Sequence, residues 1–340
     1  MKALVYTAPS KVEVRDVQPP EPVEGAAKVK MRFCGVCGTD IGIFAGKHPR
    51  AKAPLILGHE FVGVVEEVRG GKHGFKPGDR VVAYPLLSCG VCRPCRTGSP
   101  HVCEKLRLIG IDCDGGMADH AWVDESVLFK VPDELSDEVA ALVEPLAVIV
   151  RSMHQARFQI LDSAVVMGAG PIGILTAIVL KHSGASRIII SDIDEARLAM
   201  CAEFGFEALN VKKESLVDYV ARTTNGEGVD VVFECSGVES AAAEMTKIAR
   251  VGGTICMTGI HKAPHAVDLR DLNFKELTII GSRVYTQHEF GMSVAYALAL
   301  KDDLAKIVTQ TVPLTEAESV FEMIADPAVN TVKVLVDCTK

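Results

Sequence analysis

The pattern of hydrophobic and polar positions along the chain changes near residue 136. From Met1 to about Asp133, short β-branched or alternating runs are separated by Pro, Gly and Asp, as in Pro77-Gly78-Asp79. Runs punctuated in this way are typical of strands and turns, so we expect a twisted, largely antiparallel β domain. The predicted strands are Lys2–Thr7, Val12–Val17, Ala27–Phe33, Phe61–Val68 and Arg80–Ala83.

After this point, short apolar runs alternate with helical stretches. One helix is predicted from Ser136 to Val150, with Asp137 and Glu138 in its first turn, where the helix dipole favours negative charge. Buried apolar strands that alternate with helices indicate parallel βαβ units. The predicted strands are Ala164–Met167, Arg187–Ser191, Val229–Glu234, Thr254–Thr258, Leu277–Ile280 and, near the C-terminus, Thr331–Asp337. The predicted helices are Ile172–His182, Glu195–Phe204, Leu216–Thr223, Glu239–Arg250, Phe290–Leu300 and Glu316–Ile324.

Composition and charge narrow the possible classes of protein. The length of 340 residues favours two domains, and 48% hydrophobic with 24% charged residues is typical of globular proteins. The formal net charge of −8, without a block of like charges, weighs against a nucleic-acid partner or an anionic membrane surface. The uncharged stretch Ala164–Leu180 is broken by Gly and Pro, so we expect no membrane span.

Eleven cysteines are unusual for such a composition. The segment Met1–Tyr6 lacks the charged and apolar regions of a secretory signal, so we expect a cytoplasmic protein. Thiols in the cytoplasm stay reduced, and clustered cysteines there indicate metal binding or catalysis before disulfides.

One cluster lies in the loop Cys89-x-x-Cys92-x-x-Cys95-x7-Cys103. Such a loop can wrap four sulfurs around one tetrahedral zinc, in a closed shell without room for substrate. An iron–sulfur cluster and free or redox-active thiols are the alternatives. The ferredoxin spacing has three residues before its last cysteine and a proline after it, whereas seven residues precede Cys103 and Glu104 follows it. The spacing therefore favours a structural zinc.

A glycine-rich turn follows the strand predicted at Ala164–Met167. Gly168-Ala169-Gly170-Pro171-Ile172-Gly173 fits the dinucleotide pattern G-x-G-x-x-G between a strand and a helix. The glycines permit a tight turn, close approach of a pyrophosphate and close helix–strand packing. Proline suits the first helical turn, where its missing N–H has no intrahelical partner.

The strand after this turn ends at Asp192. An acid at that place can accept hydrogen bonds from the ribose hydroxyls of the adenosine and repels a 2′-phosphate, so the sequence favours NAD over NADP. Arg197 lies close by in the sequence and could tolerate the additional phosphate. The alternative is a glycine turn of another α/β protein, in which Asp192 only caps a helix. The predicted cofactor-binding residues are Gly168, Gly170, Pro171, Ile172, Gly173, Asp192 and Arg197.

A second set of zinc donors lies at strand and loop ends. Cys37 follows a predicted strand, His59 and Glu60 precede another, and Glu144 is an acid in an apolar segment, where burial is costly unless it is paired or ligates a metal. Three protein ligands and a water form an open, catalytic zinc site. Taken singly, each residue has an ordinary explanation, such as a core cysteine for Cys37 or its neighbour Cys34. Together with a dinucleotide site and a four-cysteine loop, these four residues form a combination that is specific for a catalytic zinc site.

With these motifs the chain resembles the zinc-dependent medium-chain dehydrogenases along essentially its whole length. Glu-Pro-Leu in place of a cysteine ligand is similar to the branch of sorbitol, threonine and sugar-acid dehydrogenases. The motifs that carry the resemblance are Gly35-Val36-Cys37-Gly38-Thr39-Asp40, Gly58-His59-Glu60, Pro77-Gly78-Asp79-Arg80-Val81, the four-cysteine loop, Glu144-Pro145-Leu146 and Gly168–Gly173.

The resemblance implies an α/β protein with a GroES-like, β-rich catalytic domain over residues 1–150 and a structural zinc lobe at about 88–104. A Rossmann domain with a doubly wound parallel sheet would bind NAD over residues 151–285, and residues 286–340 would return to the catalytic domain. The family also implies that Cys37, not Cys34, and His59 bind the catalytic zinc, with Glu60 or Glu144 as third ligand. A homodimer or homotetramer is expected.

The implied reaction is the reversible oxidation of a secondary alcohol. Zinc would lower the pKa of the alcohol, Thr39 would pass on its proton, and NAD would accept the hydride. The sequence departs from the family at Gly42, where a histidine five residues after the ligand cysteine usually relays the proton. A water chain from Thr39, hydroxyls of the cofactor, or His48 would then supply the exit.

The identity of the substrate rests on less specific features of the sequence. The loop Gly46–Lys52 and the short gap from Cys37 to His59 resemble hexonate and polyol dehydrogenases. Basic residues on this loop could attract a carboxylate, or could simply be a solvated surface. We expect a polyol or sugar acid, with L-threonine as the second choice and a zinc-stabilised NAD-binding protein without turnover as a different class. The basic residues concerned are Lys47, Arg50 and Lys52.

Overall fold

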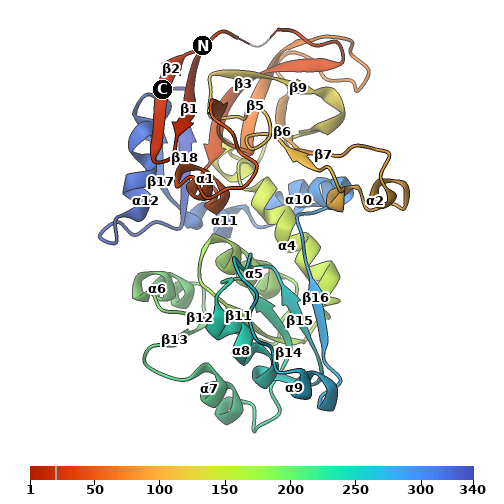
Figure 1. The fold of residues 1–340 in the computed structure, drawn as a ribbon, viewed down its shortest axis with the longest axis vertical. Helices are drawn as coiled ribbons and strands as arrows, with labels where there is room; N and C mark the ends of the chain where they lie inside the picture. The colour runs from red at the N-terminus through yellow and green to blue at the C-terminus, as the bar shows by residue number, and fades with distance from the viewer. Residues whose placement is uncertain (20) are drawn as a thin grey trace. The chain divides into compact units, whose positions relative to one another are not determined.

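The computed structural model describes residues 1–19 and 21–340. The chain divides into two compact units, one formed by Met1–Ala147 with Tyr285–Lys340 and the other by Val148–Val284. Figure 1 labels most of their helices and strands. Within the described residues, no helix combines the length and the apolar character that crossing a membrane requires.

The first unit is built mainly from antiparallel strands. Its central sheet has the order β10-β6-β5-β3-β18-β17, with β9 also paired to β3, beside the sheet β2-β1-β4 and the pair β7-β8. In β3, buried Val29 and Met31 flank exposed Lys30, the alternation that places one face of a strand on a core. The strands are β1 (Lys2–Ala8), β2 (Lys11–Asp16), β3 (Ala26–Gly35), β4 (Leu55–Ile56), β5 (Glu60–Val68), β6 (Arg80–Ala83), β7 (Leu86–Leu87), β8 (Arg107–Leu108), β9 (His120–Asp124), β10 (Leu128–Lys130), β17 (Val308–Pro313) and β18 (Lys333–Asp337).

The last strand joins the N-terminal part of the chain. β18 pairs antiparallel with β3, with Val336 opposite Cys34, and parallel with β17. The sequence pattern predicted this strand at Thr331–Asp337 but left its partner open. The pairing brings the residues of β18 to the end of β3, directly before Cys37.

One predicted helix is two helices in the structure. The run expected from Ser136 to Val150 is divided into α3 (Asp137–Ala140) and α4 (Val143–Ala156), so this prediction was wrong. Pro145 explains the break, because proline has no N–H to donate and is tolerated only in the first turn of a helix. The other helices of the first unit are α1 (Gly38–Phe44), α2 (Arg93–Arg96), α10 (Gln287–Ala299), α11 (Lys301–Ile307) and α12 (Val320–Ala325), with 3₁₀ turns η1 (Pro100–Val102), η2 (Glu125–Val127) and η3 (Leu314–Ser319).

The second unit contains a parallel sheet with the order β13-β12-β11-β14-β15-β16. This order, with helices between successive strands, is that of the doubly wound dinucleotide-binding fold, so the predicted α/β class is confirmed. Its strands are β11 (Ser163–Met167), β12 (Arg187–Asp192), β13 (Glu207–Asn210), β14 (Val229–Glu234), β15 (Ala249–Met257) and β16 (Thr278–Gly281). Its helices are α5 (Pro171–His182), α6 (Glu195–Glu203), α7 (Leu216–Thr223), α8 (Glu239–Ile248) and α9 (Leu269–Phe274).

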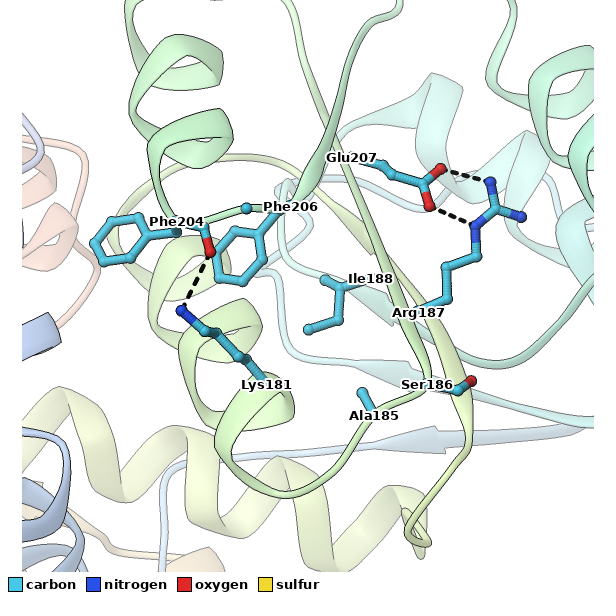
Figure 2. Close-up of a pocket in the computed structure, with 9 residues that line it drawn as sticks. Lys181, Ala185, Ser186, Arg187, Ile188, Phe204, Phe206 and Glu207 are labelled. Atoms are coloured by element: carbon cyan, nitrogen blue, oxygen red, sulfur yellow. Dashed lines mark hydrogen bonds and ion pairs between the residues drawn. The ribbon is translucent and has the colours of Figure 1, made fainter.

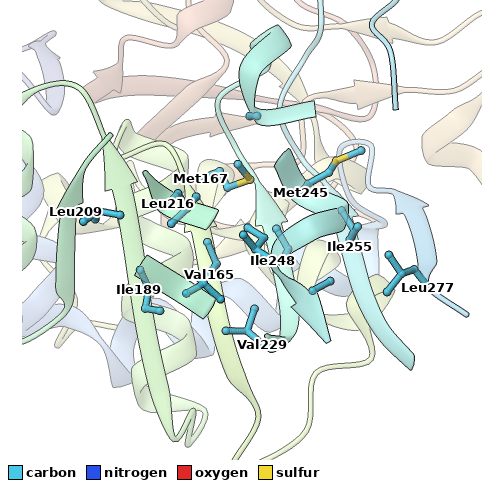
Figure 3. Packing of buried hydrophobic residues seen from close by; sticks show 14 residues of the cluster. Val165, Met167, Ile189, Leu209, Leu216, Val229, Met245, Ile248, Ile255 and Leu277 are labelled. Atoms are coloured by element: carbon cyan, nitrogen blue, oxygen red, sulfur yellow. The ribbon is translucent and has the colours of Figure 1, made fainter. Parts of the chain in front are cut away.

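The core of this unit lies between the sheet and its helices. Figure 3 shows Val165 and Ile189 of neighbouring strands in the same buried cluster as Leu216, Met245 and Ile248 from the helices. All of them are at most 1% exposed. Burial of this apolar surface holds the strand ends, and the loops on them, in fixed positions.

Two details of the second unit differ from the predicted elements. The helix expected to reach Arg250 ends at Ile248, because β15 begins at Ala249 in extended backbone. β13 was not predicted, since this short strand at the edge of the sheet is half exposed and lacks a clear apolar run.

Candidate metal centres and dinucleotide site

Cys37, His59 and Glu60 meet in the first unit. Their ligand atoms all lie within 4.8 Å of one another. Cys37 precedes α1 as its N-cap residue, while His59 directly precedes β5, of which Glu60 is the first residue. His59 is 4% and Glu60 1% exposed, so these donors face a dry environment. Thr39, the second residue of α1, is partly exposed.

Asp40 is a further charged residue at this group. One of its carboxylate oxygens accepts a hydrogen bond of 2.9 Å from the backbone N–H of Cys37. The other lies 3.9 Å from His59 Nδ1, and neither of these two atoms has a hydrogen-bond partner within the described residues. Burial alone would lower the pKa of His59, but the charges of Cys37 and Asp40 raise it well above its ordinary value.

This excess of negative charge fits a bound cation. A thiolate, an imidazole and a carboxylate are the donor types that zinc takes, and buried charges require such a partner. Asp40 stands beside His59 as an outer residue, and such residues commonly orient metal-binding histidines. A bound ion would orient the unpartnered atoms of both residues. The residues present therefore fit a zinc site.

Lys333 is a residue that the sequence did not reveal. It stands in β18, is 2% exposed, and its ammonium pairs with the carboxylate of Glu60. It also donates to the carbonyl oxygen of Val36 at 3.2 Å. The available signal was a single lysine within the apolar run Val332–Val336. Such a lysine is usually read as the exposed side of a strand.

Glu144 also receives a partner from a distant part of the chain. It lies on α4 at 9% exposure, and the fully buried hydroxyl of Tyr285 donates to its carboxylate. Burial raises the pKa of Glu144 to about 7, although His59 acts in the opposite direction. Glu144 is not within the group of three donors that Cys37 forms. Which acid is the third ligand therefore stays a prediction.

The four cysteines of the loop form a second group of donors. Cys89, Cys92, Cys95 and Cys103 have sulfur atoms within 4.8 Å of one another, with 3.4 Å between Cys92 and Cys95. Backbone N–H groups of Val91 and Cys92 lower the pKa of Cys89, whereas burial and the neighbouring thiols raise that of Cys95 to about 11. Four sulfurs at this spacing suit one tetrahedral zinc, which binds thiolates.

The glycine turn of the second unit has the geometry of a phosphate-binding loop. Gly168 has a φ of +105°, a conformation that glycine adopts without strain. A β-carbon at Gly173 would clash with the carbonyl oxygen of Gly168. Gly170 is the N-cap of α5, Pro171 its first residue and Ile172 its second, so free N–H groups of this helix begin at the turn.

Asp192 contacts this turn directly. Its carboxylate accepts a hydrogen bond of 2.6 Å from the N–H of Ala169 and further bonds from Ile193 and Asp194. The predicted acid is thus placed beside the glycines. Arg197 lies 3.8 Å from Asp194, which caps α6 through the N–H groups of Ala196 and Arg197.

A cavity of about 260 Å³ lies at the other end of β12, beside Arg187 and Ile188. Figure 2 shows its two cations turned to partners within the protein: Arg187 pairs with Glu207, and Lys181 donates to the carbonyl oxygen of Phe204. Because Asp192 ends the same strand, this cavity is separate from the glycine turn.

Comparison with known proteins agrees with this arrangement. Residues 23–133 match the family described as alcohol dehydrogenase GroES-like domain, and residues 171–299 match zinc-binding dehydrogenase. The chain is 35% identical to a 2-dehydro-3-deoxy-L-galactonate 5-dehydrogenase of Pseudoalteromonas atlantica, over 93% of both chains. It belongs to the zinc-dependent medium-chain dehydrogenases. The predicted GroES-like and Rossmann fold class is confirmed with it.

Two further relatives of this dehydrogenase show the range of the family. It is 34% identical to the L-threonine 3-dehydrogenase of Idiomarina loihiensis, over 95% of this chain and 96% of the relative. A solved structure from Sinorhizobium meliloti 1021, a putative zinc-binding dehydrogenase bound to NADP, matches with a TM-score of 0.91 and 29% identity, over 99% of this chain and 98% of that one. The dehydrogenase is thus a zinc enzyme that acts on an alcohol with an NAD(P) cofactor.

Proposed function

We propose that this dehydrogenase oxidises a secondary alcohol of a polyol or sugar acid to the ketone, with NAD as hydride acceptor. The observation that carries the proposal is the group formed by Cys37 with the buried His59 and Glu60, with the acid Glu144 in place of a second cysteine ligand. The sugar-acid dehydrogenase relative supports this substrate class. We assign the catalytic role to residues 1–150 and 286–340, and NAD binding to residues 151–285.

Cys37 and His59 would hold the catalytic zinc, with Glu60 or Glu144 as the third ligand. Zinc held there would polarise the substrate hydroxyl and lower its pKa. The ammonium of Lys333 pairs with the carboxylate of Glu60 and holds it in place. The hydroxyl of Tyr285 donates a hydrogen bond to the carboxylate of Glu144 and holds it in place. The four-cysteine lobe would hold a second, structural zinc.

Thr39 receives the proton of the substrate hydroxyl in this proposal. It lies two residues after Cys37 on α1 and is partly exposed, so its hydroxyl can accept one hydrogen bond and donate the next. Apart from its chain neighbours and the backbone of its own helix, no described residue lies within 4 Å of the place that a β-carbon of Gly42 would take. This space admits the waters that a relay without the usual histidine needs.

The glycine turn would bind the pyrophosphate of NAD, and NAD would accept the hydride that leaves the alcohol carbon. Asp192 supports NAD as cofactor, since its carboxylate stands at the turn where a 2′-phosphate would introduce further negative charge. A homodimer or homotetramer and a cytoplasmic location remain predictions.

The proposal is tested by formation of NADH over a panel of polyols, aldonates and L-threonine, with zinc content measured on the same protein. Turnover of a polyol or aldonate with two zincs per chain is expected. The threonine dehydrogenase relative makes L-threonine the second candidate, and turnover of threonine alone would select it. One zinc per chain and no NADH with any alcohol would indicate a binding protein without turnover.

The variant Cys37→Ser separates these outcomes further. It removes one donor of the catalytic group and is expected to abolish NADH formation while NAD binding stays. Cys113→Ser is the matched control, because Cys113 belongs to neither group of donors. Full activity of Cys37→Ser would contradict the site.

A further inference from the structure

The loop between α1 and β4 is fastened at several places in the first unit. The N–H of Lys47 donates to the carbonyl oxygen of Gly42 at 2.9 Å. The guanidinium of Arg50 donates to the carbonyl oxygen of Leu106 and lies 3.3 Å from the carboxylate of Asp112. A side chain carried by such a loop is held in position before substrate arrives, which lowers the entropic cost of binding.

His48 lies between these attachments and has a fixed tautomer. Its Nδ1 accepts hydrogen bonds from the backbone N–H groups of Arg50, at 3.4 Å, and Ala51, at 3.2 Å. A nitrogen that accepts cannot carry the proton, so the neutral ring carries it on Nε2. Burial and the charge of Arg50 lower the pKa of His48, which favours this neutral form.

The donating nitrogen of His48 is available. Within the described residues its Nε2 has no hydrogen-bond partner. The loop follows α1, the helix that begins after its N-cap Cys37 and carries Thr39, and Lys47 beside His48 bonds back to Gly42 of this helix. The described residues outside α1 leave the space beside Gly42 open. A neutral N–H donor therefore lies on the loop that follows the helix of Cys37 and Thr39, and the attachments of this loop hold the donor in position.

We propose that the Nε2–H of His48 recognises the substrate by donating a hydrogen bond to a hydroxyl on the carbon next to the reacting alcohol. The inference rests on the proposed function and sharpens it to vicinal diols. Arg50 is satisfied by Asp112 and Leu106, while Lys47 and Lys52 are exposed. The predicted attraction of a carboxylate by this loop thus has less support than recognition of a neutral hydroxyl.

This donor distinguishes the two candidate substrate classes by chemistry. A hydroxyl both donates and accepts, so it can receive the bond from Nε2–H. The ammonium of threonine stands on the corresponding carbon and only donates. Two donors facing each other leave both unpaired, which disfavours threonine at this site.

Two substitutions separate recognition from support of the loop. The asparagine of His48→Asn places its amide oxygen where Nδ1 was, so it can still accept hydrogen bonds from the loop N–H groups. It lacks the donor that Nε2–H provides. The glutamine of His48→Gln extends an amide N–H to the place of Nε2, but it lacks the acceptor that Nδ1 provides to the loop. Lys47→Gln is the control, an exposed neighbour on the same loop.

The test is the ratio of kcat/KM for butane-2,3-diol to that for butan-2-ol, which differ by one hydroxyl, with L-threonine as third substrate. We expect the ratio to fall about tenfold in His48→Asn, through KM of the diol, since one hydrogen bond is lost. His48→Gln should retain most of the ratio and Lys47→Gln all of it. Zinc content and the unfolding midpoint should be those of the wild type in His48→Asn.

The remaining outcomes overturn the inference. An unchanged ratio in His48→Asn, or a loss confined to His48→Gln, would show that the ring only supports the loop. A wild type without preference for the diol, or one that turns over threonine alone, would equally contradict recognition of a hydroxyl. No NADH from any alcohol would remove the proposed function itself, which separates that failure from the others.

Discussion

Lys333 and Glu60 form a buried ion pair that links β18, near the C-terminus, to β5 at the candidate zinc site. Their side chains are each 2% exposed, and β3 lies between their two strands in the sheet. Removing one partner of such a pair leaves an uncompensated charge in a dry interior. The C-terminal segment thereby supports the site both through strand pairing and through this charge.

Lys333→Met should lower the free energy of unfolding by about 3–5 kcal/mol, because the carboxylate of Glu60 stays buried without its cation. Urea unfolding of the zinc-free protein measures this loss. The double variant Lys333→Met with Glu60→Gln should recover part of it, since no charge then remains. If Lys333→Met were as stable as the wild type, the ion pair would not contribute this free energy of unfolding.

Tyr285→Phe should cost about 1–3 kcal/mol of stability, since the buried carboxylate of Glu144 loses its donor while the ring and its packing stay. We expect kcat/KM to fall as well, because Glu144 is then free to turn. Tyr84→Phe is the matched control, as the hydroxyl of Tyr84 makes only a 3.5 Å contact with the carbonyl oxygen of Tyr285. Equal effects in both variants would contradict the specific role of Tyr285.

Residues close together in sequence could be predicted as site members, and residues from distant segments could not. The cysteine loop and the pair His59-Glu60 show their donors by local spacing. Lys333 lies 273 positions from Glu60, and only the pairing of β18 with β3 brings them together.

The same limit applies to Tyr285, which lies 141 positions from Glu144. That the sheet is parallel could be predicted from the alternating strands and helices, since parallel neighbours need a crossover connection that is usually a helix. The break at Pro145 was missed because the apolar periodicity continues across it. Proline acts there through a missing donor, which the hydrophobic pattern does not show.

Cys95→Ser should remove one zinc per chain and leave the other. Three thiols and a hydroxyl bind zinc much less well than four thiolates, and the lobe's hydrophobic residues Val91 and Val102 are exposed, so they contribute little to holding it otherwise. Metal analysis measures the loss, and limited proteolysis should then cut between Cys89 and Cys103. Cys113→Ser should keep both ions; loss of the catalytic zinc in Cys95→Ser would show that the two groups depend on each other.

Asp192→Asn should raise kcat/KM for NADP relative to NAD by about 10- to 100-fold, because a repelling charge is removed and a ribose acceptor weakened. The asparagine retains one oxygen for the N–H of Ala169. Asp194→Asn is the control, since asparagine caps a helix as well as aspartate does and the charge lost is the same. An equal change in both variants would mean that net charge, not the position of Asp192, sets the preference.

Arg187 and Glu207 make the second unit sensitive to acid. Hydrogen bonds from Arg187 lower the pKa of Glu207 below its ordinary value. A carboxylate with a lowered pKa in the folded state stabilises the fold above the unfolded pKa of about 4.3, and that contribution disappears as the pH falls through the folded value. The unfolding midpoint of Arg187→Gln should therefore lie below that of the wild type at pH 7, and the gap should close below about pH 4. Glu207→Gln should show the same convergence, whereas a gap independent of pH would assign the effect of Arg187 to packing and to its bond with the carbonyl oxygen of Thr223.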